Sequence, residues 1–136
     1  MFGKIASIAL TVGILAAPGL AQDLGAAPPP APYVKVADVL PLPEFLPGLG
    51  TLYVDPDTLP AGPFLAYDHD GKLSATVYMT PIAALEGGTA YDDLALGAAT
   101  VTSVDIYYNA GHPGVEEPHA HVVLFHDDGA KGRLAE

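Results

Sequence analysis

Four of the five histidines lie in one short segment, GHPGVEEPHAHVVLFHDDG, residues 111–129, in a chain that has no cysteine. His119 and His121 are two positions apart. Residues at that spacing in a β-strand point to the same face, about 6.5 Å apart along it. Two imidazoles placed in this way can converge on one metal ion. The spacing therefore predicts a metal site on a strand, with His119 and His121 as ligands.

Further ligands are expected from the residues around this pair. The preceding loop carries His112 and Glu117, and Asp127 shares the parity of the pair if the strand continues that far. His126 has the opposite parity, so only a bulge or the end of the strand would bring it toward the pair. The principal predicted ligands are His112, His119 and His121, and the additional candidates are His126, Glu117 and Asp127.

The residue types restrict which metal such a site would hold. Imidazole together with carboxylate suits zinc, copper(II), nickel and non-haem iron. Copper(I) thiolate and iron–sulfur chemistry are excluded because there is no cysteine. A structural interpretation stays open beside the metal hypothesis, in which the histidines line a polar sheet face and form hydrogen bonds to backbone and carboxylates.

A polar patch is expected beside the histidines. In VTSVDIYYN, residues 101–109, alternation places Asp105, Tyr107 and Asn109 on one strand face. Antiparallel pairing of this run with residues 119–126 would bring the patch next to the histidine pair. Ordinary cross-strand aromatic packing is the alternative explanation for these residues.

The rest of the chain predicts the elements that must position this site. Residues 63–67 and 72–80 are typical of a hairpin, because two apolar, β-branched runs flank the turn sequence DHDG. Alternation in the second run places Leu73, Ala75, Val77 and Met79 on one face.

Shorter elements and an irregular segment complete the expected domain. A short strand is expected at 52–55, a helix at 81–86, and a second helical turn at 91–96. The proline-interrupted run 39–55 should wrap the core as irregular chain. The prediction is a mainly β (α+β) domain: a small antiparallel sheet or barrel-like domain with one or two short helices.

The chain divides into three predicted parts. Residues 1–21 have a lysine, an apolar run and small residues before a cleavage position, which indicates a cleaved export signal. Residues 22–37 are expected to form a tether rich in proline and alanine, and 38–136 a single β-rich domain. We expect a periplasmic or secreted protein with no stable membrane insertion after cleavage.

The charge balance limits the partners. The formal net charge is −11, with only five lysines and arginines. Nucleic acid is not an expected partner, because a phosphate backbone requires a basic footprint. A protein partner or self-association remains open.

Two long runs carry a resemblance to a known family. LPGLGTLYVDPDTLPAGPFLAYDHDGKLSATVYMTP and VDIYYNAGHPGVEEPHAHVVLFH resemble the TTHB-like family, small exported bacterial proteins with a domain of unknown function. The family motif matches here at Gly111, His112, Pro113, Gly114, Pro118 and His119. The resemblance implies fold and export more than chemistry. A weaker similarity is to the first motif of cupins, where His126 stands in place of the usual glutamate.

Three functions fit these observations. The preferred one is a non-enzymatic extracytoplasmic protein that binds a divalent transition metal. The alternative is a metal-independent interaction module, such as a stress-related oligomer, that presents a β domain on a tether. The third is a metal-dependent enzyme with an open coordination position facing Tyr107 and Asn109.

Overall fold

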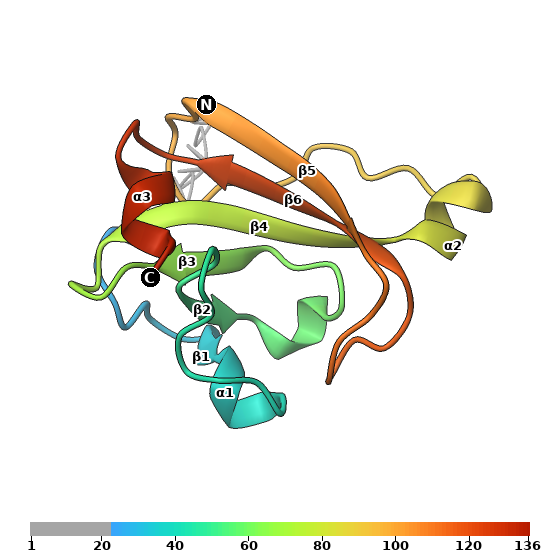
Figure 1. Ribbon diagram of the computed structural model, residues 1–136, viewed down its shortest axis with the longest axis horizontal. Helices are drawn as coiled ribbons and strands as arrows, with labels where there is room; N and C mark the ends of the chain where they lie inside the picture. Colours follow the sequence, from blue (N-terminus) through green and yellow to red (C-terminus); the bar gives the residue numbers. More distant parts are fainter. Residues whose placement is uncertain (1–22) are drawn as a thin grey trace, which may run out of the picture.

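Six strands form one antiparallel sheet in the order β1-β2-β3-β4-β6-β5 (Figure 1). The computed structural model describes residues 23–136, so the expected export signal lies outside the described residues. The strands are β1 Val34–Lys35, β2 Thr51–Val54, β3 Phe64–Tyr67, β4 Leu73–Pro81, β5 Ser103–Asn109 and β6 His119–Phe125. Because β1 and β5 form two edges, the sheet is open and not a closed barrel. The predicted mainly β antiparallel fold is confirmed.

Three short α-helices follow strands β1, β4 and β6 in the described part of the chain. They are α1 Val36–Val39, α2 Ile82–Glu86 and α3 Ala130–Leu134, with a 3-10 turn at Pro56–Thr58. The predicted helix after β4 is present as α2, whereas α1 and α3 were not predicted. No helix in the part of the chain that the structure describes combines the length and apolar character needed to cross a membrane.

The predicted hairpin is formed by β3 and β4, and its turn is held by one aspartate. Asp68 Oδ1 accepts hydrogen bonds of 2.9 Å from the backbone N–H of both Asp70 and Lys72, which is the local bonding that makes aspartate a turn former. The register shifts beyond Ala66, which alters the predicted facing of β4. Leu73 packs with Leu65 and Tyr67 instead of with the rest of the predicted face, so its predicted side was wrong.

The main core lies on one face of the sheet. Its central members are Ala75, Val77 and Met79 of β4, with Val123 and Phe125 of β6. The proline-interrupted segment 39–50 and helix α3 lie over this face (Figure 1). Side chains of that segment pack against the core, at Leu40, Leu42, Leu46 and Leu49. The predicted wrapping of run 39–55 over the core is therefore confirmed for residues 40–50, while Val39 ends α1 and Thr51–Val54 form β2.

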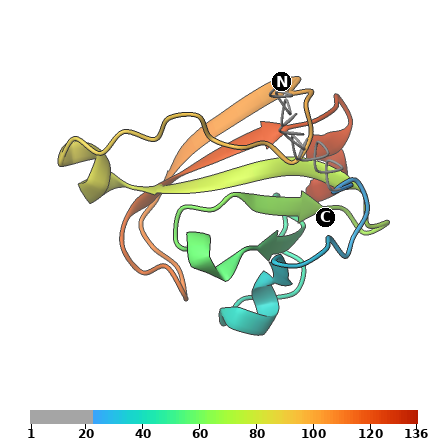
Figure 2. The same ribbon diagram turned by 180° about the vertical axis from the view of Figure 1, so that it is seen from behind.

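The opposite face is crossed by the connection 87–102 between α2 and β5 (Figure 2). The Tyr78 hydroxyl donates a hydrogen bond to the Ala95 carbonyl, and Gly97 N–H donates to Thr76 Oγ1 at 2.8 Å. The predicted helical turn at 91–96 was wrong, since this stretch is irregular. Side chains from the sheet bond its backbone in place of helical hydrogen bonds.

The segment before β1 also contacts the sheet. Ala27 N–H donates to the Gly71 carbonyl at 2.8 Å, and the Tyr67 hydroxyl donates to the Leu24 carbonyl at 2.7 Å. Leu24, Ala27 and Tyr33 pack against the second apolar cluster, which includes Tyr67. The division into signal, tether and domain stays a prediction.

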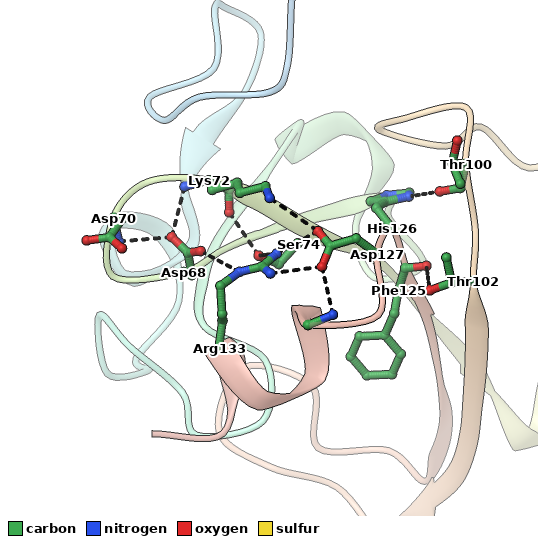
Figure 3. A network of polar contacts seen from close by, with 11 residues as sticks. Asp68, Asp70, Lys72, Ser74, Thr100, Thr102, Phe125, His126, Asp127 and Arg133 are labelled. Atoms are coloured by element: carbon green, nitrogen blue, oxygen red, sulfur yellow. Dashed lines mark hydrogen bonds and ion pairs between the residues drawn. The ribbon is translucent and has the colours of Figure 1, made fainter.

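Helix α3 is attached to the β3–β4 hairpin by a charged network (Figure 3). Arg133 Nε donates to Asp68 Oδ2 at 2.8 Å, and its two terminal nitrogens donate to Asp127 Oδ1 and Oδ2 at 2.8 and 2.7 Å. Ser74 Oγ accepts a further bond of 3.1 Å. Bidentate pairing of a guanidinium with a carboxylate is geometrically specific. The network therefore fixes the position of α3 against the β3–β4 turn.

Candidate metal centre

The central pair of histidines comes from β6. Burial alternates along this strand, and His119 and His121 lie on its buried side, only 0% and 4% exposed. His121 pairs with Met79 of β4 on one side and with Tyr107 of β5 on the other. The predicted antiparallel pairing of the last two long strands is confirmed. The register also places Asn109 opposite His119.

The loop between β5 and β6 supplies the third histidine. His112 and Val115 exchange two backbone hydrogen bonds of 3.0 Å, which makes a tight reversal. Gly111 has a φ of +120°, and a Cβ there would lie 2.1 Å from the Glu116 carbonyl oxygen, so a side chain at this position would collide with the backbone. The loop folds back in this way and brings His112 to the β6 pair.

The three histidines form one cluster. One ring nitrogen from each of His112, His119 and His121 lies within 4.8 Å of the others. The rings of His119 and His121 are stacked with centroids 4.8 Å apart, and the His112 ring lies edge-on to the His119 ring at 4.9 Å. Three histidines at this spacing can hold a metal ion.

An oxygen atom lies beside the Nδ1 atom of every ring in the cluster. His119 Nδ1 is 2.8 Å from the Glu117 carbonyl oxygen, and His112 Nδ1 is 3.1 Å from the Pro113 carbonyl oxygen. The Tyr107 hydroxyl lies 3.1 Å from His121 Nδ1. Each Nε2 is thereby left as the ligand atom, which is the arrangement found around metal-bound histidine.

A chain of hydrogen bonds joins His119, His121 and Tyr107. A carbonyl can only accept, so His119 Nδ1 carries a proton, and in the neutral imidazole His119 Nε2 is then the acceptor. The Nε2 atoms of His119 and His121 are 2.8 Å apart, so His121 Nε2 donates this bond. His121 Nδ1 then accepts from the Tyr107 hydroxyl. The pair is fully satisfied, since no buried side-chain nitrogen or oxygen among the described residues lacks a partner.

The environment favours the neutral form of His121. Burial lowers its pKa to about 4, and the neighbouring His119 and His112 rings lower it in the same direction. The ring is therefore uncharged at neutral pH. Neutral imidazole is the form that binds metal ions.

The other candidate ligands lie outside this cluster. His126 is buried apart from the cluster, with Nε2 at 2.8 Å from Thr76 Oγ1 and Nδ1 at 2.7 Å from the Thr100 carbonyl oxygen. Asp127 pairs with Arg133. Glu117 is exposed and contributes only its carbonyl oxygen. The structure brings together the three principal candidates and none of the three additional ones.

The three residues of the predicted polar patch have different partners. Tyr107 contacts His121, whereas the Asp105 carboxylate lies 2.7 Å from Lys131 Nζ in an exposed ion pair. Asn109 Oδ1 accepts a 2.9 Å bond from Gly111 N–H, which holds the start of the histidine loop.

Sequence reasoning did not identify the wall that faces the histidines. A cavity of about 290 Å³ borders the cluster. Its lining consists of Leu42, Leu46, Pro47, Leu49, Tyr107, Asn109, His112 and His121. The leucines come from the irregular segment 39–50, which is far from the histidines in the sequence. The prolines of this segment predicted that it would wrap the core, but they did not predict that it would lie beside the histidines.

Removing the Tyr107 hydroxyl tests the contact with His121. In a Tyr107→Phe variant we expect the affinity for zinc to fall by about 10-fold, because outer hydrogen bonds to metal-binding histidines contribute 10- to 100-fold and this one is partly exposed. Competition titration with a chromophoric chelator measures the change. Tyr108→Phe is the matched control, because Tyr108 is on the opposite, exposed face of β5. Equal zinc affinities in the two variants would show that the Tyr107 hydroxyl does not contribute to metal binding.

The fold and the cluster define a small open antiparallel sheet with three histidines gathered at one end of its core face. Among solved structures, the chain is similar to the hypothetical protein TTHB210 from Thermus thermophilus, with 45% sequence identity and a TM-score of 0.61. The similarity covers 70% of this chain and 94% of that one. The chain belongs to the family of that protein, as the resemblance implied.

Comparisons with protein-family models and with curated proteins do not indicate a function. No protein-family model matches the chain, and no curated protein matches it. The weaker similarity to cupins finds no support.

Proposed function

We propose that this protein binds one divalent transition metal ion through Nε2 of His112, His119 and His121. The observation that carries the proposal is the arrangement of the three rings: each has an oxygen atom beside Nδ1, and one nitrogen of each ring lies within 4.8 Å of the others. Structural histidines in a core need only satisfied nitrogens. Convergence of three rings is the feature that a metal ion explains.

The geometry of the cluster suits a metal after a small movement. Tetrahedral zinc with Zn–N bonds of 2.0–2.1 Å needs nitrogens about 3.3 Å apart. The two Nε2 atoms that now lie at 2.8 Å must therefore separate slightly, and nitrogens as far apart as 4.8 Å must approach each other. His121 then carries its proton on Nδ1 and donates to the Tyr107 hydroxyl. Tyrosine can exchange donor and acceptor roles, so the same contact supports both states.

The ligand set indicates which metals to test. All three ligands are imidazoles, which suit zinc, copper(II), nickel and iron. Magnesium and calcium prefer oxygen ligands, and carboxylates are not part of the cluster. The site would serve metal buffering, metal delivery or stabilisation of the fold. The apolar run at residues 5–17 supports placing this role outside the cytoplasm, in the periplasm or secreted.

A second candidate is a metal-independent interaction module. The outer side of edge strand β5 exposes Val104, Ile106 and Tyr108, with 48%, 71% and 64% of each residue accessible. Adjacent exposed apolar side chains mark many protein interaction sites. This role predicts indifference to chelators.

The deciding experiment is elemental analysis of tag-free protein, followed by thermal melting with and without a chelator. We expect near-stoichiometric zinc, copper, nickel or iron. An ion present at 100 times its dissociation constant stabilises the folded state by about 2.7 kcal/mol, so the chelator should lower the melting temperature by roughly 10 °C. Protein that contains no metal, gains none on addition and melts unchanged would refute the proposal in favour of the interaction module.

A further inference from the structure

The cavity beside the histidines has a polar and an apolar part in its lining. Strands β5 and β6 and the loop between them supply His112, His121, Tyr107 and Asn109, and the segment that packs over the core face supplies Leu42, Leu46, Pro47 and Leu49. His119 is fully buried and does not line it. A metal ion held by the cluster would therefore have His119 behind it and the cavity in front.

Three protein ligands leave a coordination position open. Four-coordinate metals held by three protein side chains keep the fourth position for water or an exogenous ligand. Because imidazole binds a metal as a neutral ligand, a divalent ion would keep its full charge of +2 here, and an anionic oxygen donor would partly neutralise it. Tyr107 and Asn109 are the other polar residues in the cavity lining.

The facing wall is apolar and continues inward. A smaller void of about 20 Å³ shares Leu42, Leu46 and Leu49 with the outer cavity and extends to Phe64 and Met79. Its lining also includes His112 and His121. An aliphatic chain that starts at the metal would thus meet leucine side chains directly, and its end would point toward the apolar core.

The size of the cavity restricts the ligand further. Sites for drug-sized molecules usually have volumes of about 300–1,000 Å³, and the outer cavity is about 290 Å³. The cavity is therefore at the small end of that range, which suits a small ligand with an anionic oxygen at one end and a short apolar chain at the other.

We propose that the metal-loaded site binds short-chain aliphatic monocarboxylates, with a carboxylate oxygen on the open metal position and the alkyl chain against Leu42, Leu46 and Leu49. This inference rests on the proposed metal site. It assigns the apolar segment 39–50 a role in ligand recognition besides its packing role. No bond is made or broken in the ligand, and the carboxylate displaces water from the metal.

The test uses the full-length folded protein loaded with Co²⁺, whose visible absorption reports directly on coordination. Sodium acetate, butyrate and hexanoate are titrated in turn. We expect each to change the spectrum, with affinity rising about fourfold for each buried methylene, or about 16-fold from acetate to butyrate. Hexanoate should not bind the metal-free protein with comparable affinity.

Two variants separate the apolar wall from the metal. Leu46→Ala should retain Co²⁺ and acetate binding while reducing the gain from acetate to hexanoate. Leu85→Ala, which removes an exposed leucine on α2, is the matched control and should leave the series unchanged. The series in the unaltered protein tests the inference even if Leu46→Ala folds poorly.

The outcomes distinguish the two proposals. Failure to take up Co²⁺, zinc, copper, nickel or iron would overturn both the metal site and this inference. Metal uptake with no spectral response to any acid would overturn the inference and leave the metal site standing. Equal affinity for acetate and hexanoate would also overturn it, because the leucines would then not contact the ligand.

Discussion

A His119→Ala, His121→Ala double variant should lose metal binding by more than about 100-fold, because removing two ligands must exceed the 10- to 100-fold effect of an outer hydrogen bond. Both rings belong to the buried side of β6, and His112 alone cannot hold the ion. Isothermal titration with zinc measures the loss. Circular dichroism should show that the sheet is retained.

Two further variants test whether the loss of zinc binding is specific to the cluster. His112→Ala removes the half-exposed ligand from the loop and should weaken binding without disturbing the buried pair. His69→Ala removes a histidine that stacks on Phe45 outside the cluster, and it should bind zinc normally. Normal zinc binding by the double variant would refute the three-histidine site.

Replacing Arg133 with alanine should destabilise the fold by about 2–3 kcal/mol, which is the largest stability effect we expect from a single charged residue. The variant leaves the Asp68 carboxylate, whose side chain is only 4% exposed, without its cation, and an unpaired buried charge is costly. It also removes the two bonds to Asp127 that hold α3 (Figure 3). Urea unfolding measures the change.

A neighbouring lysine supplies the control. Lys131→Ala removes a charge from the same helix, but its ion pair with Asp105 is exposed, and such pairs contribute about 0.2–1 kcal/mol. A similar effect from both variants would show that α3 responds to charge in general. The buried network would then not be the cause.

The same network predicts how stability depends on pH. The hydrogen bond from Arg133 lowers the pKa of Asp127 well below its usual range. Burial alone would raise the pKa of Asp68, but bonds from Lys72 N–H, Asp70 N–H and Arg133 outweigh it and lower the pKa. Because both pKa values are depressed, their stabilisation is present above the unfolded pKa of about 3.9 and is lost as the pH falls below it. Arg133→Ala should therefore flatten the fall in stability below about pH 4.

Local patterns alone were sufficient to predict much of this protein. Alternation of apolar and polar residues has the period of a strand, and it indicated β3, β4, β5 and β6 within a few residues. The same alternation predicted that His119 and His121 share a face with Tyr107 and Asn109. The prolines of segment 39–50 excluded regular structure there for a local reason, because they lack a backbone donor.

Tertiary structure decided the features that depend on contacts between distant residues. A register shift beside Ala66 placed the Leu73 side chain on the face opposite to the predicted one. A strict alternation of two cannot predict such a shift. Helix α3 contains a glycine at position 132 and has no local signal strong enough to predict it, and Arg133 holds it through Asp68, 65 residues earlier.

The site divides in the same way between sequence and tertiary structure. Spacing alone made His119 and His121 a pair, because strand geometry is local. The sequence also predicted His112 as a ligand from the loop, but only the fold placed it beside the pair, engaged His126 with Thr76 and Thr100, and brought three leucines into the lining of the adjacent cavity. The reason is that loop closure and packing are determined by the whole chain, whereas the direction of a side chain along a strand depends only on its neighbours.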